Sequence, residues 1–383
     1  MITHVFHSTV VSGPETLVIP ALKNIGEPVT IVFLSETRVQ GGATGPVEYA
    51  RALGHEVHSV PVRGRWDRKA FKELRELLDR LKPRVVHAHD VKASLYLMKA
   101  AQARPDFVPG LVSTHHGAVA RSGIIRLYEE FYVRYVLPYF DATMCVCEGD
   151  IASLSRRGLP LEKLHLHING VERPMVAAAA RIDVQRSVRN RWKQAVEAIP
   201  GPNDALVVGA VARLSGEKRH DRMIHAMATV KRKLAPRRAV LLCFGIGAEE
   251  AKLKELTKAA GLEDTVFWMG YSKTIGSEMA GFDLLLCLSD GEGIPINLLE
   301  AGWAGTPVFS TRVGGIPDVL SNPQVGYLVD KSESDETIGA MMAETLADYA
   351  GRARVGEAYQ RHVIANFSER AWLATLKKVY DGI

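Results

Sequence analysis

The chain has 383 residues, of which 47% are hydrophobic and 24% are charged, and its formal net charge is +5. This composition is typical of an ordinary globular protein, and the length is sufficient for two domains. The small positive charge favours anionic small molecules or an anionic membrane surface, and it is too weak to indicate nucleic-acid binding. Neither a signal peptide nor an apolar run of membrane-spanning length is evident, so we expect a cytoplasmic protein.

The first half of the chain alternates short apolar runs with helical patterns. Such alternation predicts βαβ units and a parallel sheet. The expected strands cover residues 1–8, 29–34, 55–60, 85–89, 111–114 and 142–146. The expected helices cover residues 14–22, 71–81, 91–103 and 124–137. This set ends near residues 165–169, and we predict an N-terminal domain over 1–175.

A change of composition follows, with four consecutive alanines, a basic helix-prone stretch and a Pro-Gly-Pro-Asn turn. We predict a linker over 176–199 and a second domain over 200–367. The strands expected in this domain cover 206–212, 239–244, 266–269, 284–288, 308–310 and 326–329. The last expected helices cover 334–346 and 369–379. The predicted fold class is therefore α/β, with two Rossmann-like, doubly wound parallel-sheet domains facing each other across a cleft.

The four cysteines lie in apolar, strand-like runs, at Cys145, Cys147, Cys243 and Cys287. We therefore expect buried thiols and no disulfide framework, which fits a reducing compartment. His87 and His89 fall on one side of a single strand. No third ligand is evident from the spacing, so no metal site is expected there.

The most informative stretch is 289–319, SDGEGIPINLLEAGWAGTPVFSTRVGGIPDV, which follows a buried-strand pattern at 282–288. Pro295 suits the first position of a helix, where its missing N–H would have no partner. The free N–H groups before it would face the open end of the sheet and hold an anion or a polar ligand. Glu292 and Glu300 lie on either side of this helix start, so both carboxylates can address one cleft. Strand, glycine-rich turn and helix in succession are typical of a ligand crevice at the carboxyl ends of strands.

In its glutamate pair, Glu292-x7-Glu300, embedded in EGIPINLLEAGWAGTPV, the chain resembles the retaining glycosyltransferases of the GT-B fold, in the family-four branch that uses nucleotide sugars. The resemblance covers nearly the whole chain. It implies that Glu292 lies against hydroxyls of the donor sugar and Glu300 at the nucleotide ribose. These roles suit carboxylates, because a carboxylate accepts hydrogen bonds from vicinal diols. It also implies that the sugar and phosphate are approached by the backbone of Gly293, Ile294, Pro295 and Ile296.

A second matching segment is VGAVARLSGEK at 208–218, which predicts a strand, a loop and a helix start. Arg213 and Lys218 match the two cations that the family places here, whereas Ala212 stands where relatives often have glycine. The resemblance implies that the cations neutralise the leaving diphosphate, because preorganised positive charge stabilises the anion that forms. The chain has no D-x-D, the usual carboxylate spacing for a metal-bound nucleotide sugar. We therefore expect no metal and no cofactor besides the donor substrate.

In the first domain, the resemblance implies that a histidine after the strand 111–114 touches the donor sugar. His116 matches because Gly117 follows it, and His115 takes this role if the register differs by one. A histidine at the end of a strand is more often structural than catalytic, and that explanation stays open.

Three further positions match places where the family uses its backbone. Gly13 matches the N-terminal glycine turn, where the missing Cβ lets the acceptor and the diphosphate approach. Gly245 and Met269 match places where relatives hold the base. A ligand-free glycine turn and ordinary core packing are the competing explanations for these positions.

The resemblance implies retaining transfer of a sugar from a nucleoside diphosphate sugar to an acceptor hydroxyl, by front-face attack and without a covalent nucleophile. UDP-sugars are the first expectation for the donor and GDP-mannose the second. The acceptor would be a glycan, a lipid-linked or lipopolysaccharide-type molecule or a small molecule, as in cell-envelope polysaccharide synthesis. The second domain would bind the donor and the first domain the acceptor. A C-terminal helix over about 368–383 would cross back and become part of the first domain. The expected catalytic residues are Glu292, His116, Arg213 and Lys218.

Three alternatives stay open. A sugar-nucleotide epimerase of the same fold would need extra carboxylates in the first domain, where only Glu15 and Asp90 are evident. A dinucleotide-binding oxidoreductase would need G-x-G-x-x-G, which the first βα turn lacks. A non-catalytic nucleotide-sugar-binding protein would be expected to lose the paired glutamate or the cations, and all of these are present.

Two basic and aromatic clusters in the first domain are compatible with peripheral association with an anionic membrane. Solvated helix faces are the ordinary alternative. The first cluster comprises Arg63, Arg65, Trp66, Arg68 and Lys69. The second comprises Arg121, Arg126, Tyr128, Phe131, Tyr132, Arg134 and Tyr135.

Overall fold

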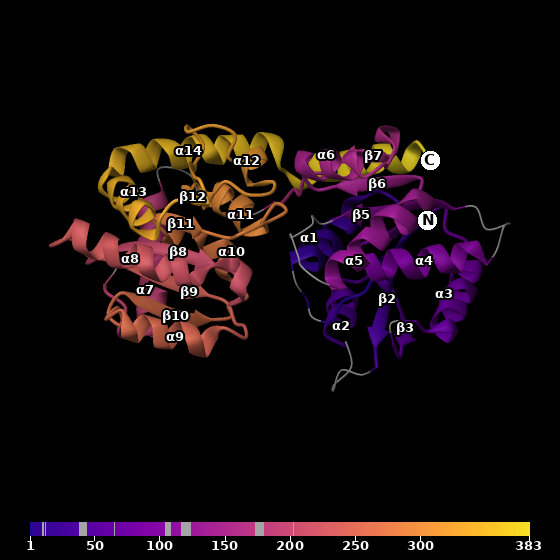
Figure 1. The fold of residues 1–383 in the computed structure, drawn as a ribbon, viewed down its shortest axis with the longest axis horizontal. Coiled ribbons are helices and arrows are strands. Elements are labelled where there is room, and N and C mark those ends of the chain that lie inside the picture. The colour runs from indigo at the N-terminus through magenta and orange to yellow at the C-terminus, as the bar shows by residue number, and fades with distance from the viewer. Residues whose placement is uncertain are drawn as a thin grey trace. The chain divides into compact units, whose positions relative to one another are not determined.

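A computed structural model gives the fold and describes residues 1–383 except 10, 12, 38–43, 65, 104–108, 116–123, 173–179 and 202 (Figure 1). The described residues form two compact units. Unit 1 comprises Met1–Gly170 and Glu369–Ile383, and unit 2 comprises Val171–Ser368. Each unit is built on its own parallel sheet.

Unit 1 has a seven-stranded sheet in the order β3-β2-β1-β4-β5-β6-β7. Its strand pairs are parallel, and the order reverses beside β1, as in doubly wound folds. The strands are mostly buried because helices cover a parallel sheet on both faces. They are β1 (Ile2–Phe6), β2 (Val29–Glu36), β3 (Glu56–Val62), β4 (Val85–Ala88), β5 (Gly110–His115), β6 (Ala142–Cys145) and β7 (Leu164–Leu166).

Aspartates begin two helices of unit 1. Asp67 accepts hydrogen bonds from two backbone N–H groups, at 3.0 and 3.2 Å, at the start of α3, and Asp90 accepts two at 2.8 Å at the start of α4. The helices are α1 (Gly13–Ala21), α2 (Thr44–Ala52), α3 (Arg68–Leu81), α4 (Val91–Gln102), α5 (Ile124–Phe131), α6 (Glu148–Arg156) and α15 (Glu369–Asp381). Short helical turns are η1 (Leu22–Asn24), η2 (Tyr132–Val136), η3 (Leu137–Tyr139) and η4 (Leu161–Lys163).

Helix α15 packs into unit 1 although it follows unit 2 in the chain. The Tyr380 hydroxyl lies 2.5 Å from His87 Nδ1. His167 Nε2 lies 3.1 Å from the backbone oxygen of Trp372, and the two rings stack with centroids 4.7 Å apart. The last helix therefore contributes buried side chains to the core of unit 1.

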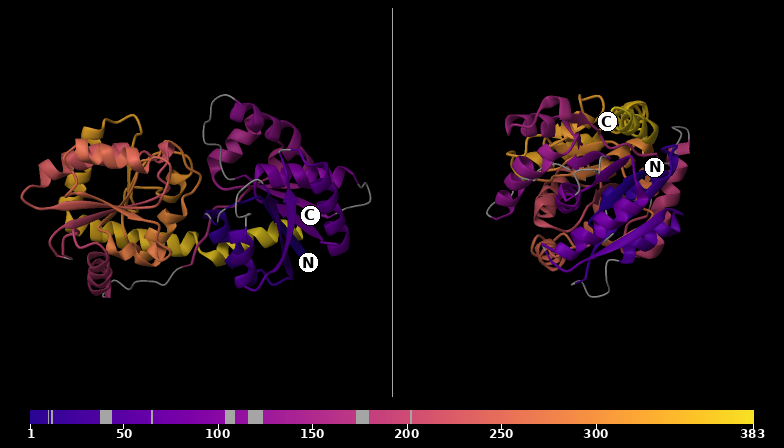
Figure 2. Two further views of the ribbon diagram at one scale, coloured as in Figure 1. Left: turned by 90° about the horizontal axis from the view of Figure 1, so that it is seen from below. Right: turned by 90° about the vertical axis from the view of Figure 1, so that its right-hand side faces the viewer.

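Unit 2 has a six-stranded parallel sheet in the order β10-β9-β8-β11-β12-β13, with helices on both of its faces (Figure 2). Its strands are β8 (Leu206–Val211), β9 (Ala239–Phe244), β10 (Val266–Gly270), β11 (Leu284–Cys287), β12 (Val308–Thr311) and β13 (Tyr327–Val329). Its helices are α7 (Arg181–Ala195), α8 (His220–Leu234), α9 (Glu250–Ala259), α10 (Ile275–Glu278), α11 (Ile296–Ala304), α12 (Ile316–Val319), α13 (Asp335–Ala347) and α14 (Tyr349–Asn366). Its short turns are η6 (Gly216–Lys218) and η7 (Met279–Gly281).

Helix α7 occupies most of the stretch 176–199, for which the sequence predicts a linker. In the structure this helix belongs to unit 2. Trp192 stacks on Phe282 with ring centroids 5.1 Å apart, and Arg189 Nη2 lies 2.6 Å from Asp283 Oδ2. Helix α7 has a polar composition because few of its side chains are buried, namely Val188, Arg189 and Trp192.

Candidate functional site

Three loops of unit 2 meet at the carboxyl end of its sheet, because they follow the adjacent strands β8, β11 and β12. Backbone hydrogen bonds join them. The Asp290 N–H donates to the Glu217 carbonyl oxygen at 2.9 Å, and the Gly315 N–H donates to the Gly293 carbonyl oxygen at 3.0 Å. Gly314 has φ +53, and a Cβ there would lie 1.6 Å from a carbonyl oxygen of the loop after β11. Only glycine permits this approach, so the loops form one packed surface.

Glu292 is held at this surface by two side chains. Lys218 Nζ lies 2.6 and 2.7 Å from its two carboxylate oxygens, and the Ser289 hydroxyl donates to Oε1 at 2.6 Å. The side chains of Lys218 and Glu292 are 18% and 10% exposed, so this ion pair is largely shielded from solvent. Two residues predicted to act on the donor, 74 positions apart in sequence, are thus in direct contact.

A thiol lies behind this carboxylate. Cys287 Sγ is 4.0 Å from Glu292 Oε1 and 3.6 Å from Ser289 Oγ. Burial first, and the Glu292 charge second, raise the pKa of the Cys287 thiol above its usual value. The thiol therefore stays protonated, and Cys287 is a packing residue and not a nucleophile.

Arg213 extends from the loop after β8. Its side chain is 75% exposed, and Nη2 lies 3.1 Å from Glu217 Oε1. Burial alone would raise the pKa of Glu217, but the hydrogen bond from Ser215 at 2.7 Å and the nearby cations keep it below its usual value. Both predicted phosphate-binding cations therefore face carboxylates of the same region, Lys218 facing Glu292 and Arg213 facing Glu217.

The segment 293–296 leads directly into α11. Pro295 is the N-cap residue and Ile296 the first helical one, so the expectation of Pro295 at the first helical position is wrong by one residue. Pro295 has extended backbone, φ −66 and ψ 130, in which its ring is unstrained. Glu300 lies on α11 beside Gly276, where a Cβ would come within 2.4 Å of its Oε1. Gly276 thus makes room for the second glutamate of the pair.

Gly245 and Met269 lie at the carboxyl ends of the neighbouring strands β9 and β10. Gly245 has φ +145, and a Cβ there would lie 1.9 Å from the Ala212 carbonyl oxygen. Glycine is therefore required for the loop after β9 to close on the loop that carries Arg213. The Gly245 N–H donates to the Gly270 carbonyl oxygen at 2.8 Å, which joins both predicted base-binding positions to this surface.

The predicted first-domain positions are only partly described. His116 lies outside the described residues. His115 ends β5, is 6% exposed and places Nε2 3.9 Å from Asp150 Oδ1. Gly13 is the first residue of α1. These positions belong to unit 1, whereas all the other predicted site residues belong to unit 2.

Three buried histidines of unit 1 form the one group of potential metal ligands among the described residues. Nitrogen atoms of His4, His87 and His89 lie within 4.8 Å of one another. From spacing alone no third ligand was evident, but the sheet supplies His4 because it pairs with His87 in the β1–β4 register. His4 Nδ1 hydrogen-bonds to His89 Nε2 at 2.7 Å, and His87 bonds to Thr114 and Tyr380. These nitrogens therefore belong to a hydrogen-bonded network of the core.

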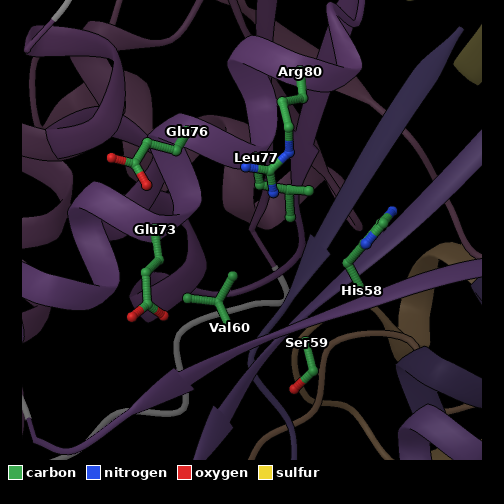
Figure 3. Close-up of a pocket in the computed structure, with 7 residues that line it drawn as sticks. All are labelled: His58, Ser59, Val60, Glu73, Glu76, Leu77 and Arg80. Carbon is green, nitrogen blue, oxygen red and sulfur yellow. The ribbon is translucent and has the colours of Figure 1, made fainter.

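One surface hollow of about 220 Å³ lies on unit 1, between the edge strand β3 and helix α3 (Figure 3). Charged side chains and an imidazole surround it, and none of the predicted site residues takes part. The lining residues are His58, Ser59, Val60, Glu73, Glu76, Leu77 and Arg80.

Sequence reasoning did not identify Ser289, Asp290 or Arg219. Ser289 stands three residues before Glu292, a spacing at which a hydroxyl and a carboxylate can meet, so a local signal existed. Arg219 and Asp290 are 71 residues apart and meet only because β8 and β11 are neighbours. No local pattern could have paired them.

No helix among the described residues has the length and apolar character needed to cross a membrane.

Two family models match the chain. Glycosyl transferases group 1 matches residues 193–362, and Glycosyltransferase Family 4 matches residues 19–173. The chain is 30% identical over 145 residues to N-acetyl-alpha-D-glucosaminyl L-malate synthase of Bacillus anthracis, 38% of each chain. It is 29% identical over 180 residues to the UDP-N-acetylglucosamine--peptide N-acetylglucosaminyltransferase GtfA subunit of Streptococcus gordonii, 44% of this chain and 35% of that one. The matches thus span less than half of these relatives.

Among solved structures, Anabaena Alr3699/HepE in complex with UDP superposes with a TM-score of 0.81 at 16% identity, with all of both chains covered. The lipopolysaccharide outer core galactosyltransferase WaaB superposes with a TM-score of 0.74, also at 16% identity and over all of both chains. At this identity the likeness concerns the fold, which is two Rossmann-like parallel-sheet units, as the sequence predicts.

Proposed function

Since this chain belongs to the family-four type of GT-B glycosyltransferases, we propose that it transfers a sugar from a nucleoside diphosphate sugar to a hydroxyl of an acceptor. The observation that supports this most directly is the Glu292 carboxylate, held by Lys218 and Ser289 where β8 and β11 end. Ligands of doubly wound sheets bind at such carboxyl ends.

The residues would divide the work by charge. Glu292 accepts hydrogen bonds from hydroxyls of the donor sugar, and Glu300 does the same for the ribose. Lys218 and Arg213 neutralise the diphosphate as it leaves, which takes the place of a metal ion in this proposal. Lys218 is paired with the Glu292 carboxylate in the structure. When the diphosphate binds, Lys218 would leave this carboxylate and pair with a phosphate group.

The transfer would retain the configuration of the sugar. The acceptor hydroxyl attacks from the face that the diphosphate leaves, and a leaving phosphate oxygen takes its proton, so no side chain acts as covalent nucleophile or separate base. The backbone N–H groups after Gly293, at the start of α11, favour the negative charge that develops. We assign His116 the role of touching the sugar, because the Gly117 that follows it matches the family's motif.

UDP-sugars are the first candidates for the donor and GDP-mannose the second. In support, the GtfA subunit is named for UDP-N-acetylglucosamine, and the Alr3699/HepE structure contains UDP. A mannosyltransferase of Mycolicibacterium smegmatis, 28% identical over 191 residues, is named as GDP-mannose-dependent. We propose an acceptor of the glycan, lipid-linked or lipopolysaccharide type, and the name of the lipopolysaccharide outer core galactosyltransferase WaaB supports the last of these.

A lipid-linked acceptor would bring the protein to an anionic membrane surface. Unit 1 exposes several large apolar side chains near Arg134, on α5 and the turns that follow it, which would contact such a surface. They are Leu127, Tyr128, Tyr135 and Tyr139. Sedimentation with vesicles, with and without anionic lipid, tests this part separately from catalysis.

The first test is thermal unfolding of the purified protein with UDP, GDP, ADP or TDP in the presence of a chelator. A ligand that binds only the folded protein adds about 2.7 kcal/mol to the free energy of unfolding at one hundred times its Kd. We expect one nucleotide to raise the midpoint, and Arg213→Ala/Lys218→Ala to abolish that rise. Transfer assays with sugars of that nucleotide then follow. Binding without transfer to any acceptor would favour a non-catalytic binding protein, and no binding at all would refute the proposal.

A further inference from the structure

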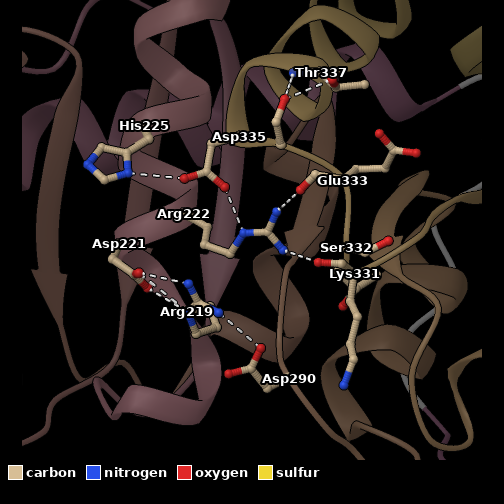
Figure 4. A network of polar contacts seen from close by, with 12 residues as sticks. Arg219, Asp221, Arg222, His225, Asp290, Lys331, Ser332, Glu333, Asp335 and Thr337 are labelled. Carbon is tan, nitrogen blue, oxygen red and sulfur yellow. Dashed lines mark hydrogen bonds and ion pairs between the residues drawn. The ribbon is translucent and has the colours of Figure 1, made fainter.

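Three consecutive residues after β8 each contact the segment 290–292 after β11. The Glu217 carbonyl oxygen accepts the Asp290 N–H at 2.9 Å, and Lys218 pairs with the Glu292 carboxylate. Arg219 Nη1 lies 3.0 Å from Asp290 Oδ1 (Figure 4). The pair proposed to act on the donor, Lys218 and Glu292, is thus bordered by a second ion pair, Arg219 and Asp290.

Arg219 has an unusual backbone conformation. Its φ of 52 and ψ of 43 are left-handed, and among the described residues only Lys82 shares a positive φ without being glycine. Side chains disfavour this region, and such strain persists only where the surroundings impose it. Here the guanidinium spans two carboxylates: Nε and Nη2 lie 3.1 Å from Asp221 oxygens, and Nη1 reaches Asp290.

We propose that Arg219 is a positioning residue, which keeps the loop of Lys218 in register with the loop of Glu292 during the reaction. The inference rests on the proposed function. In the structure Lys218 and Glu292 hold each other, but a bound diphosphate would take Lys218 and a bound sugar would take Glu292. The loops would then be joined by the backbone bond of Asp290 and by the Arg219–Asp290 ion pair. Losing that ion pair would let Lys218 and Glu292, and with them the bound diphosphate and sugar, drift apart, and small misplacements slow reactions strongly.

Arginine suits this position better than lysine does. Its planar fork presents several donors in fixed directions, so one side chain can bind Asp221 and Asp290 at once. A lysine would offer a single ammonium group, which would choose between the two carboxylates. Asp290 directly follows Ser289, whose hydroxyl donates a hydrogen bond to Glu292. The same short segment therefore carries this donor and the carboxylate that binds Arg219; we call the Arg219–Asp290 ion pair the clamp.

The test is steady-state kinetics with the nucleotide sugar that the wild-type protein turns over, for Arg219→Gln, Asp290→Asn and the double variant. We expect each single variant to lower kcat/KM for the donor about tenfold, with the KM for the acceptor unchanged. The double variant should be no worse than either single one, because both remove the same contact. Arg219→Lys should recover part of the activity. The unfolding midpoint should move little, because the Arg219 and Asp290 side chains are partly solvent-exposed.

Two controls separate positioning from a structural role. Arg232→Gln breaks a different exposed ion pair, in which Nη2 of this α8 residue lies 3.1 Å from Glu336 Oε1, and it should leave the kinetics unchanged. Arg219→Gly relieves the left-handed backbone and also removes the clamp. If Arg219 acts by positioning the loops, Arg219→Gly has the same low kcat/KM as Arg219→Gln, although its unfolding midpoint is at least as high as that of Arg219→Gln.

Three results would overturn the inference: wild-type kinetics for Arg219→Gln, multiplying losses in the double variant, or full activity of Arg219→Gly. Failure of the proposed function would look different. It would leave the wild-type protein without nucleotide binding or turnover, and the inference would fall with it.

Discussion

At the scale of residues, the Glu292 carboxylate receives its hydrogen bonds unevenly. Oε1 lies 2.6 Å from both Lys218 Nζ and the Ser289 hydroxyl, whereas Oε2 lies 2.7 Å from Lys218 Nζ. Ser289 is 1% exposed, so its bond is protected from competition by water. If Lys218 turned to a bound diphosphate, as proposed, Ser289 would still fix the direction of the carboxylate.

This arrangement predicts a kinetic defect for Ser289→Ala. We expect kcat/KM for the donor to fall about tenfold, equivalent to about 1.4 kcal/mol, because hydrogen bonds to charged groups contribute about 1.5–3 kcal/mol. Ser310→Ala is the matched control, since this buried hydroxyl donates to the Cys287 carbonyl oxygen at 3.0 Å and does not reach Glu292. It should affect stability alone. Equal kinetic losses in both variants would contradict a specific role for Ser289.

At the scale of elements, the sequence predicts the central strands well because strands of a parallel sheet are continuous apolar runs. Strand β2, Val29–Glu36, extends the predicted 29–34 by two residues. The three-residue strand β7 is too short to show a pattern. Helix α7 reads as a linker because most of its surface is polar, and its few buried side chains find partners, such as Phe282, far away in the sequence.

The interface of β1, β4 and α15 shows a similar dependence on distant residues. His4 and His87 lie side by side on neighbouring strands, and the Tyr380 hydroxyl of α15 lies between them, 2.5 Å from His87 Nδ1 and 3.5 Å from His4 Nε2. Burial first, and the charge of His55 second, lower the pKa of His4 to about 3. The histidine is therefore neutral inside the folded protein at neutral pH.

Acid should consequently weaken the folded state. Between pH 6.5 and 3 the unfolded chain binds a proton at His4 that the folded chain does not, so the free energy of unfolding falls as the pH is lowered through this window. One such group contributes up to about 1.4 kcal/mol per pH unit. Urea unfolding at pH 7, 6 and 5 should show this loss, with a shallower dependence for His4→Gln. If the free energy of unfolding changed equally with pH in the variant and in the wild type, His4 would not be the group responsible.

At the scale of the whole molecule, the predicted site residues divide unequally between the units. Unit 2 carries Glu292, Glu300, Arg213, Lys218 and the glycine-rich segments, and it contains the match to glycosyl transferases group 1 over 193–362. The family-four match over 19–173 lies almost entirely in unit 1. The sequence predicts the unit 2 residues from a dense motif, whereas it predicts the unit 1 positions from single glycines and histidines.

Hydrogen exchange can locate the donor directly. The nucleotide that raises the unfolding midpoint should slow exchange in peptides over 212–219 and 288–296, because a bound ligand suppresses local opening of the loops that hold it. Peptides of the edge strand β3 and its neighbour β2 should exchange at an unchanged rate. The opposite pattern, protection over 29–62 without protection over 288–296, would place the nucleotide in unit 1.

The return of α15 to unit 1 has a consequence for how the chain is made. Residues 1–170 emerge first during translation, but the helix that supplies Trp372 and Tyr380 to their core is made only after the 198 residues of Val171–Ser368. Domains generally fold as they emerge, the N-terminal one first, and here the order of completion is reversed. Unit 2 can fold completely before α15 is synthesised. Until then unit 1 lacks its last helix, and His87 and His167 lack their contacts with Tyr380 and Trp372. A nascent chain stalled before residue 369 would therefore expose to chaperones the surface of unit 1 that α15 covers in the folded protein.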